Sequence, residues 1–186
     1  MQPGWKPEPS SFPRTRYTRR NTVTLWLRRL RRSSAPMRGE ESEEVSKMSV
    51  GWGVIGAGGI ADRRTIPEGI LPARNAHLVA VMGRNEPRVR EVAEKYGGVA
   101  WYTKEEDLLA NGEVQAVYVA TPNHLHCEQT VRALRAGKHV LCEKPMAMNL
   151  AEGEKMIEVA QEHNLKLAIG YMMRFHAWHQ ELKRLV

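Results

Sequence analysis

The segment GVIGAGGIAD, which runs from Gly53 to Asp62, constrains the fold of this chain more than any other stretch. It follows an apolar run typical of a buried strand, and Gly56, Gly58 and Ala61 form the spacing G-x-G-x-x-A. The first glycine permits a tight turn, the second lets a pyrophosphate approach the backbone, and the small third residue lets a helix pack closely on the sheet. Alone, the motif is equally consistent with a glycine-rich structural turn. The strand before it, the helix after it and a second strand about twenty residues later favour a dinucleotide-binding loop.

Beyond Met48, short β-rich runs alternate with segments of helical period, which is the pattern of a parallel sheet with crossover helices. The runs AVYVA and HLVAVM are apolar on both faces, as strands covered on both sides by helices must be. We therefore predict an α/β protein with a doubly wound parallel-sheet Rossmann fold in three α/β/α layers. Strands are expected near residues 50–55, 77–82, 98–102, 114–120, 138–142 and 166–170.

Three predicted helices have clear ends and apolar faces. Asn85 can cap the first, which Gly97 ends, and the second begins after Asn123 and stops at Gly137. Asn149 can cap the third. The residues expected to face inward are Val89, Val92, Ala93 and Tyr96 in the first helix, Cys127, Val131 and Leu134 in the second, and Met156, Ile157 and Ala160 in the third.

The first 47 residues differ in composition from the rest of the chain. They hold 11 Lys and Arg against 5 acidic residues, whereas the remainder holds 17 against 16. The net charge of +7 therefore belongs mainly to this segment, and the nearly neutral remainder predicts no nucleic-acid partner. We predict a disordered basic extension at residues 1–47, because its Pro, Ser and Arg content cannot bury enough apolar surface to fold. An export signal and an organelle presequence are less favoured than a solvated tail or a misassigned start upstream of Met48.

The cysteines and the hydropathy pattern exclude several classes of protein. Cys127 and Cys142 lack metal-ligand spacing, so no metal site is expected. A chain of this size needs no disulfide framework, which favours a reducing, cytoplasmic setting. No apolar run approaches the roughly 18 to 20 residues of a membrane span, so no membrane partner is expected.

The end of the second predicted strand bears on the choice of cofactor. A carboxylate there would hold the ribose hydroxyls of NAD, but this strand ends in Met82, Gly83, Arg84 and Asn85. Because Arg84 can pair with a 2′-phosphate, NADP is favoured over NAD, although Arg84 can also be an ordinary solvated arginine. In this half of the site the expected cofactor-binding residues are Gly56, Gly58, Gly59, Ile60, Ala61, Gly83, Arg84 and Asn85.

A family resemblance is carried by three stretches of the sequence: GVIGAGGIA, AVYVATPNHLHCEQTVRALRAGKHVLCEKPMAMN and AIGYMMRFH. Together they resemble the nucleotide-binding domain of the Gfo/Idh/MocA oxidoreductases, which act on sugars, cyclitols and related polyols. The match runs from about Val50 to the C-terminus. Members of that family continue with a second domain that supplies most of the substrate pocket and much of the oligomer interface.

The resemblance also implies where the chemistry lies. The loop after the fourth predicted strand would lie beside the nicotinamide. The E-K-P turn after the fifth would bring its lysine to the cofactor and the reacting hydroxyl, often across a cis peptide bond before the proline. The matched residues are Thr121, Pro122, Asn123, His124 and His126, then Glu143, Lys144 and Pro145, then Arg174, Phe175 and His176. The resemblance implies a catalytic role for Lys144 and cofactor contacts for Thr121, Pro122, Asn123, His126, Glu143, Lys144 and Arg174.

Physical chemistry gives an independent view of the same residues. They follow predicted strands, so their side chains should gather at the carboxyl edge of the sheet, where an open α/β fold binds ligands. Lys144, held by Pro145, is a candidate cation to steady an alkoxide or exchange a proton, although residue type alone favours a plain turn lysine. Asn123 can also be a helix cap. His124 and His126 should point to different helix faces, so at most one should reach the nicotinamide and a joint metal site is not expected.

These expectations define the domains and the function. Residues 48–175 should form the dinucleotide-binding domain, and residues 176–186 should begin a linker helix to an absent substrate domain. Trp178, Leu182 and Val186 have helical spacing and are expected to be a packing stripe. The chain should be the amino-terminal half of an NAD(P)-dependent, homo-oligomeric oxidoreductase that transfers hydride between nicotinamide and a sugar, cyclitol or polyol. The alternative is a nucleotide-binding module, or a truncated remnant, without turnover.

Overall fold

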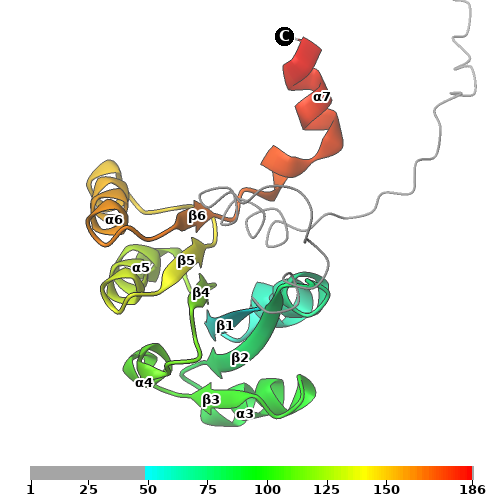
Figure 1. Cartoon of the computed structure of the whole chain (residues 1–186), viewed down its shortest axis with the longest axis vertical. Coiled ribbons are helices and arrows are strands. Elements are labelled where there is room, and N and C mark those ends of the chain that lie inside the picture. The colour runs from blue at the N-terminus through cyan, green and yellow to red at the C-terminus, as the bar shows by residue number, and fades with distance from the viewer. Residues whose placement is uncertain (1–48, 186) are drawn as a thin grey trace, which may run out of the picture.

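A sheet of six parallel strands organises the chain (Figure 1). The computed structural model describes residues 49–185, so the disorder expected for residues 1–47 lies outside the described residues. The strands are β1 (Val50–Ile55), β2 (Ala76–Met82), β3 (Ala100–Tyr102), β4 (Ala116–Val119), β5 (His139–Cys142) and β6 (Leu167–Ile169). Their spatial order is β3-β2-β1-β4-β5-β6, with β1 and β4 side by side at the centre. This is the doubly wound order of a Rossmann fold, and the predicted fold is confirmed.

Helices cover both faces of the sheet and enclose two apolar cores. One core lies between the sheet and the helices η2 (Ala61–Ile70) and α3 (Glu86–Lys95). The other lies between the sheet and three helices: α4 (Glu105–Ala110), α5 (His126–Arg135) and α6 (Leu150–Glu162). The structure therefore has the three α/β/α layers predicted from the sequence, and β4 is buried along its whole length between them.

The helix that follows the glycine loop is wider than an α-helix. In η2 the Leu71 N–H donates to the carbonyl of Ile66, five residues earlier, at 3.1 Å, as in a π-helix. Pro67 lies inside this helix and has no N–H to donate. The inward residues Ala61, Ile66 and Ile70 are all fully buried, so the helix still packs one apolar face onto the sheet.

Two of the predicted helix starts are confirmed by their hydrogen bonds. The Asn85 side chain accepts from the Arg88 N–H at 3.0 Å at the start of α3. The Asn149 side chain accepts from the Glu152 N–H at 2.9 Å at the start of α6. These bonds satisfy N–H groups that have no partner within the first turn of a helix.

Two sequence expectations about helices are wrong, and one helix was not expected. Asn123 does not cap α5, because it begins the short 3₁₀ helix η3 (Asn123–Leu125) and α5 starts without a side-chain cap. In α6, Ile157 is 46% exposed, and Val159 lies inward with Met156 and Ala160 instead. The reason is geometric, because the neighbours of Met156 on one face are three and four residues on. The helix α4 was not anticipated.

The segment after β6 extends away from the sheet (Figure 1). It consists of the 3₁₀ helix η4 (Met172–Phe175) and the helix α7 (Ala177–Leu185), whose main contacts are with η4. Trp178 and Leu182 share a face of α7 but are 67% and 61% exposed, so the expected packing stripe is not buried, and Val186 lies outside the described residues. Within residues 49–185, no helix combines the length and apolarity that a bilayer crossing requires.

Candidate functional site

A cavity of about 400 Å³ lies where β1, β2 and β4 end. This is the point at which the strand order reverses, and open α/β sheets bind their ligands there. The volume falls within the usual range for small-molecule sites. The lining residues come from the glycine loop, the end of β2 with the start of α3, and the loop after β4 with α5: Gly56, Ala57, Gly58, Gly59, Met82, Gly83, Arg84, Asn85, Arg88, Val89, Ala120, Thr121, Pro122, Leu125 and Gln129.

The glycine loop forms its side of the cavity from backbone. Gly56 has a φ of +90°, and a Cβ there would lie 2.8 Å from the carbonyl carbon and oxygen of Ala120. The loop is anchored to β2, because the Gly56 and Ala57 N–H groups both donate to the Met82 carbonyl, at 3.0 and 2.9 Å. The helix that follows begins at residue 59, and the N–H groups of residues 59 and 60 precede the first N–H that donates within it. The arrangement can therefore offer backbone donors to an anion.

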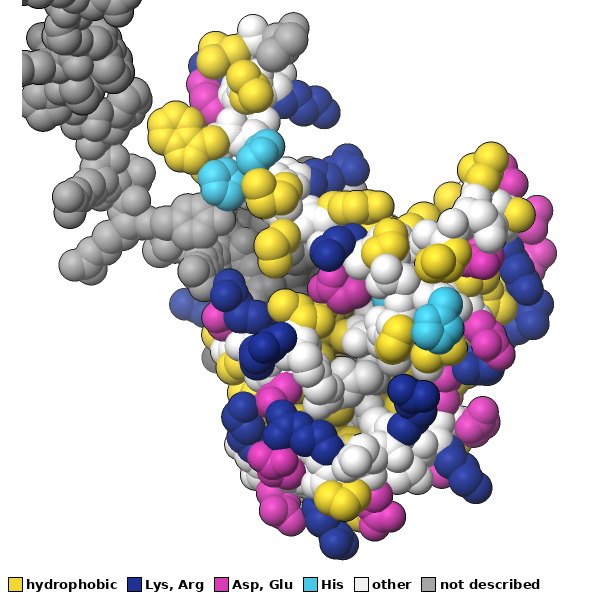
Figure 2. All heavy atoms as spheres, turned by 180° about the vertical axis from the view of Figure 1, so that it is seen from behind, with side chains coloured by type: hydrophobic (Ala, Val, Ile, Leu, Met, Phe, Trp, Pro, Cys, Tyr) yellow, Lys and Arg dark blue, Asp and Glu magenta, His cyan; other side chains and the backbone are white. Residues whose placement is uncertain are grey.

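The end of β2 adds positive charge to the cavity. Among the described residues that line it, Arg84 and Arg88 are the charged ones and none is Asp or Glu. Gly83 continues the sheet edge, with its N–H donating to the Tyr102 carbonyl at 3.1 Å. Elsewhere the surface is mixed: Figure 2 shows Lys and Arg side chains interspersed with Asp and Glu over one face of the molecule. The cavity therefore favours an anionic ligand, with its cations gathered at the β2 end.

Arg88 is held in place by a buried carboxylate. Asp62, at the start of η2, accepts from Arg88 Nη2 at 2.7 Å and from Lys95 Nζ at 2.8 Å, and the Tyr96 hydroxyl lies 3.0 Å from its Oδ1. Burial pushes the pKa of the Asp62 carboxyl upward. The hydrogen bonds from Lys95 and Tyr96 and the charges of Lys95 and Arg88 outweigh that effect, so the pKa lies below its ordinary value. The cluster ties α3 to the helix of the glycine loop.

The loop after β4 is held by buried side chains of α5. The Thr121 hydroxyl donates to Gln129 Oε1, and His126 Nε2 lies 2.9 Å from the Thr121 carbonyl oxygen. The other ring nitrogen of His126, Nδ1, lies 2.7 Å from the Pro145 carbonyl oxygen. His126 is 0% exposed, so its ring links the Thr121 loop to the Lys144–Pro145 turn and has no surface to offer a ligand.

A second side-chain network supports the Lys144 turn. Tyr118, which is 1% exposed, donates to Glu143 Oε1 at 2.6 Å and accepts from the Thr65 hydroxyl at 2.9 Å. Burial, then the charge and hydrogen bond of Glu143, raises the pKa of Tyr118 far above its ordinary value, so this phenol remains a donor. Glu143 Oε2 accepts from the Lys144 N–H at 3.1 Å, and the Lys144–Pro145 peptide bond is cis, as the family resemblance implied.

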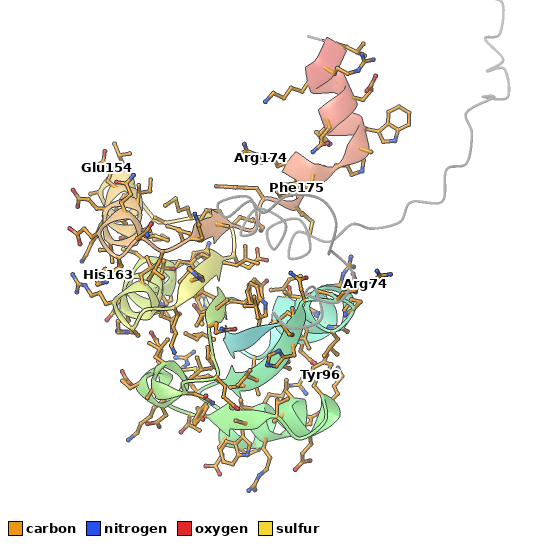
Figure 3. The ribbon with its side chains drawn as sticks, viewed as in Figure 1. Arg74, Tyr96, Glu154, His163, Arg174 and Phe175 are labelled. Carbon is orange, nitrogen blue, oxygen red and sulfur yellow. The ribbon has the colours of Figure 1, made fainter. Side chains whose placement is uncertain are left out.

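The structure brings together part of the predicted site in one cavity. Gly56, Gly58, Gly59, Gly83, Arg84, Asn85, Thr121 and Pro122 line it. The other predicted residues, Ile60, Ala61, Asn123, His126, Glu143, Lys144 and Arg174, do not. Lys144 is exposed at the end of β5, the strand next to β4. Figure 3 shows Arg174 and Phe175 at the base of α7, well separated from Tyr96 near the end of α3.

Several lining residues were missed by sequence reasoning, and two of them are polar. Arg88 lies four residues after Arg84 and close to the capping Asn85, a spacing that could have suggested a second arginine at the same helix start. Gln129 lies three residues after His126 on the buried side of α5, but no motif marks it. No group of His, Cys, Asp and Glu side chains in the described part of the chain has the arrangement of a metal site.

The amino-acid sequence of this chain is similar to those of known oxidoreductases. Residues 50–171 match the family model GFO_IDH_MocA, described as "Oxidoreductase family, NAD-binding Rossmann fold". The 1,5-anhydro-D-fructose reductase of Ensifer adhaerens is 39% identical over 132 residues, which cover 71% of this chain and 39% of that protein.

Solved structures agree with the sequence matches. A 3-ketoreductase from Actinomadura kijaniata, in complex with NADP and TDP-benzene, matches with a TM-score of 0.69 and 35% identity, covering 72% of this chain and 41% of that one. The WlbA dehydrogenase from Bordetella pertussis, in complex with NADH and UDP-GlcNAcA, matches with a TM-score of 0.61 and 30% identity, covering 67% and 35%. This chain spans about two fifths of the length of the relatives it matches.

Proposed function

This chain belongs to the Gfo/Idh/MocA oxidoreductase family, and from that premise we propose that it forms the cofactor-binding part of an NADP-preferring enzyme. The enzyme would transfer hydride between nicotinamide and a carbinol carbon of a sugar, cyclitol or related polyol. The observation that carries the proposal is the cavity at the switch point of the sheet, which has arginines and no carboxylate at the end of β2. The relatives include complexes with NADP and with NADH, so the preference rests on this chain's own residues.

The residues of the cavity fit a dinucleotide. A Cβ built at Gly58 or Gly59 would meet no other atom within 4 Å, so the space beside the loop is open to a ligand. The backbone N–H groups of residues 59 and 60, at the helix start, would hold the pyrophosphate, and Arg84 would pair with the 2′-phosphate of the adenosine ribose. The cis turn after β5 would present the exposed Lys144 toward the reacting end of the site.

Lys144 would act on the oxygen of the substrate. When bound, the nicotinamide supplies or accepts the hydride. The Lys144 ammonium would stabilise negative charge on the carbinol oxygen and exchange a proton with it. Glu143 accepts a hydrogen bond from the Lys144 N–H, and the buried Tyr118 hydroxyl donates to Glu143. These two bonds fix the backbone that carries the lysine. The remainder of the substrate pocket would come from a second domain, in keeping with relatives of which the matched segment covers only about two fifths.

The alternative reading, a binding module without turnover, gains no support from the relatives, which are named as reductases and dehydrogenases. A cytoplasmic setting and a homo-oligomer containing the second domain remain part of the proposal. The two thiols, Cys127 and Cys142, are free and buried, which is compatible with a reducing compartment.

A binding experiment tests the proposed function. The chain is titrated with NADPH and with NADH while the fluorescence of the reduced nicotinamide is followed. Competition by 2′,5′-ADP and by 5′-AMP then isolates the contribution of the 2′-phosphate. We expect NADPH to bind about tenfold more tightly than NADH, with the same order for the two competitors. Equal affinities would refute the NADP preference, and the absence of binding below millimolar concentration would refute the dinucleotide site.

A further inference from the structure

A series of hydrogen bonds between side chains leads from the cavity wall to the surface of the domain. It joins Thr121 to Gln129, Gln129 to Glu105, and Glu105 to Arg132. Gln129 and Glu105 are 5% and 4% exposed, so the middle of this hydrogen-bonded series is buried. Thr121 and Gln129 both line the cavity, so this series of hydrogen bonds ends at the cavity wall.

The direction of each bond is fixed from the surface inward. A guanidinium can only donate, and Arg132 donates from Nε and Nη2 to the two carboxylate oxygens of Glu105, at 3.0 and 2.9 Å. The hydrogen bond to Glu105 raises the pKa of Arg132, which keeps this cation charged. The Glu105 carboxylate can only accept, so Gln129 turns its Nε2 toward it at 3.0 Å.

The same logic fixes the hydroxyl of Thr121. Because the amide nitrogen of Gln129 faces Glu105, its amide oxygen faces Thr121, and the Thr121 hydroxyl must donate to it. A hydroxyl whose proton is used in this way has only lone pairs left for the cavity. The Thr121 carbonyl is held as well, by His126 Nε2 at 2.9 Å. The hydroxyl and the carbonyl of this residue are therefore both held by side chains from the first turn of α5.

We propose that Gln129 is a positioning residue that makes Thr121 a hydrogen-bond acceptor toward the cofactor. Glu105, held by Arg132, fixes the orientation of the Gln129 amide. This inference rests on the proposed function. An acceptor at this point suits the donor groups of the nicotinamide half of the cofactor, a ribose hydroxyl or the carboxamide N–H, and disfavours phosphate oxygen. The cavity thereby distinguishes two parts of its ligand: the pyrophosphate on the glycine loop, and the donor groups of the nicotinamide half at Thr121.

The test compares a whole cofactor with a fragment that lacks the nicotinamide half. Gln129→Leu releases the Thr121 hydroxyl, so we expect NADPH affinity to fall about tenfold while 2′,5′-ADP affinity changes less than twofold. Glu105→Gln keeps the size of the side chain, but an amide can donate as well as accept and no longer fixes the orientation of Gln129. It should lower NADPH affinity about threefold. Glu128→Gln is the matched control, because it removes the charge of the exposed partner of the same arginine and should change neither affinity.

The outcomes separate this inference from the proposed function. A parallel loss of NADPH and 2′,5′-ADP affinity in Gln129→Leu would make Gln129 a merely structural residue and overturn the inference. Unchanged NADPH affinity in both Gln129→Leu and Glu105→Gln would also overturn it. Circular dichroism and thermal unfolding identify a variant that fails to fold, in which case the remaining variant decides. If the unaltered chain binds neither ligand, the proposed function itself fails and the inference with it.

Discussion

The glycine loop after β1 and the loop after β4 face the same cavity but keep their shapes by different contacts. The first is held by backbone, with two N–H groups of residues 56 and 57 on the Met82 carbonyl and a glycine against Ala120. The second is held by side chains of α5, because Gln129 and His126 contact the hydroxyl and the carbonyl of Thr121. Glu143, in the neighbouring turn after β5, depends in the same way on Tyr118.

This difference separates two kinds of sensitivity to mutation. A backbone-built loop tolerates many side-chain changes nearby but no added atom at the point of close approach. A loop built on side chains tolerates changes in its own residues and depends on polar partners far along the chain, such as Glu105 and Tyr118. Substitutions in the two loops should therefore differ in what they lose: stability and all cofactor binding at the glycine loop, and support for single side chains at the other.

Gly56→Ala should be the most damaging change. Its Cβ would lie 2.8 Å from the Ala120 carbonyl at a φ of +90°, so the loop must shift away from β4. We expect the free energy of unfolding to fall by about 3 kcal/mol, measured by urea denaturation, together with loss of NADPH binding.

Gly58→Ala is the matched control for this prediction. A Cβ at Gly58 meets no atom within 4 Å, so stability should stay within about 0.5 kcal/mol of the unaltered chain while NADPH binding weakens. Equal destabilisation by the two substitutions would show that close approach to Ala120 is not what shapes the loop.

Asp62→Asn should cost about 2 kcal/mol at neutral pH, because it removes a buried negative charge and one of the two oxygens that accept from Arg88 and Lys95. The native pKa of Asp62 is depressed, so its stabilisation is present above the unfolded value, near 3.8, and is lost as the pH falls through the native value. Unfolding measured from pH 7 to pH 2 should show the difference between variant and unaltered chain shrinking below about pH 4. A difference that does not change with pH would exclude this role for the carboxylate.

Arg84→Ala should weaken NADPH binding about tenfold and leave NADH binding and the unfolding temperature unchanged. The reason is that Arg84 is exposed at the end of β2 and lines the cavity. Fluorescence titration measures both affinities. Equal weakening of NADPH and NADH binding would assign Arg84 to the part that the two cofactors share.

Tyr118→Phe should have the smallest effect, about 1 kcal/mol in the free energy of unfolding, because it removes one buried donor to Glu143 and one acceptor of Thr65. Since Tyr118 does not line the cavity, 2′,5′-ADP affinity should not change. Thr65→Val serves as a control that removes only the second bond. A loss of 2′,5′-ADP affinity in Tyr118→Phe would mean that the two halves of the site are not independent.

The fold could be predicted from the sequence because its signals are local. The glycine spacing, the capping residues Asn85 and Asn149 and the apolar strands each lie within a few neighbouring residues, and together they led to the observed sheet. The misplaced Ile157 shows the limit of that approach, since a stretch with several apolar residues fits more than one inward face until the neighbours are known.

The site was only half predictable for the same reason. The backbone-built loop is a contiguous motif, and its glycines line the cavity as expected. The side-chain networks join residues that are 24 or 25 positions apart, Gln129 with Glu105 and Tyr118 with Glu143, and no spacing rule connects them. His126 was expected at the cofactor because it lies in the matched loop, but tertiary contacts bury its ring beneath that loop.

The link between Arg88 and Asp62 also limits how this site could be redesigned. Converting an NADP site to an NAD site usually means placing an acid at the end of the second strand, here by Arg84→Asp. The new carboxylate would line the same cavity as the Arg88 guanidinium, which Asp62 holds there and which would compete with the ribose hydroxyls for it. A coenzyme switch in this chain would therefore have to change the two arginines together.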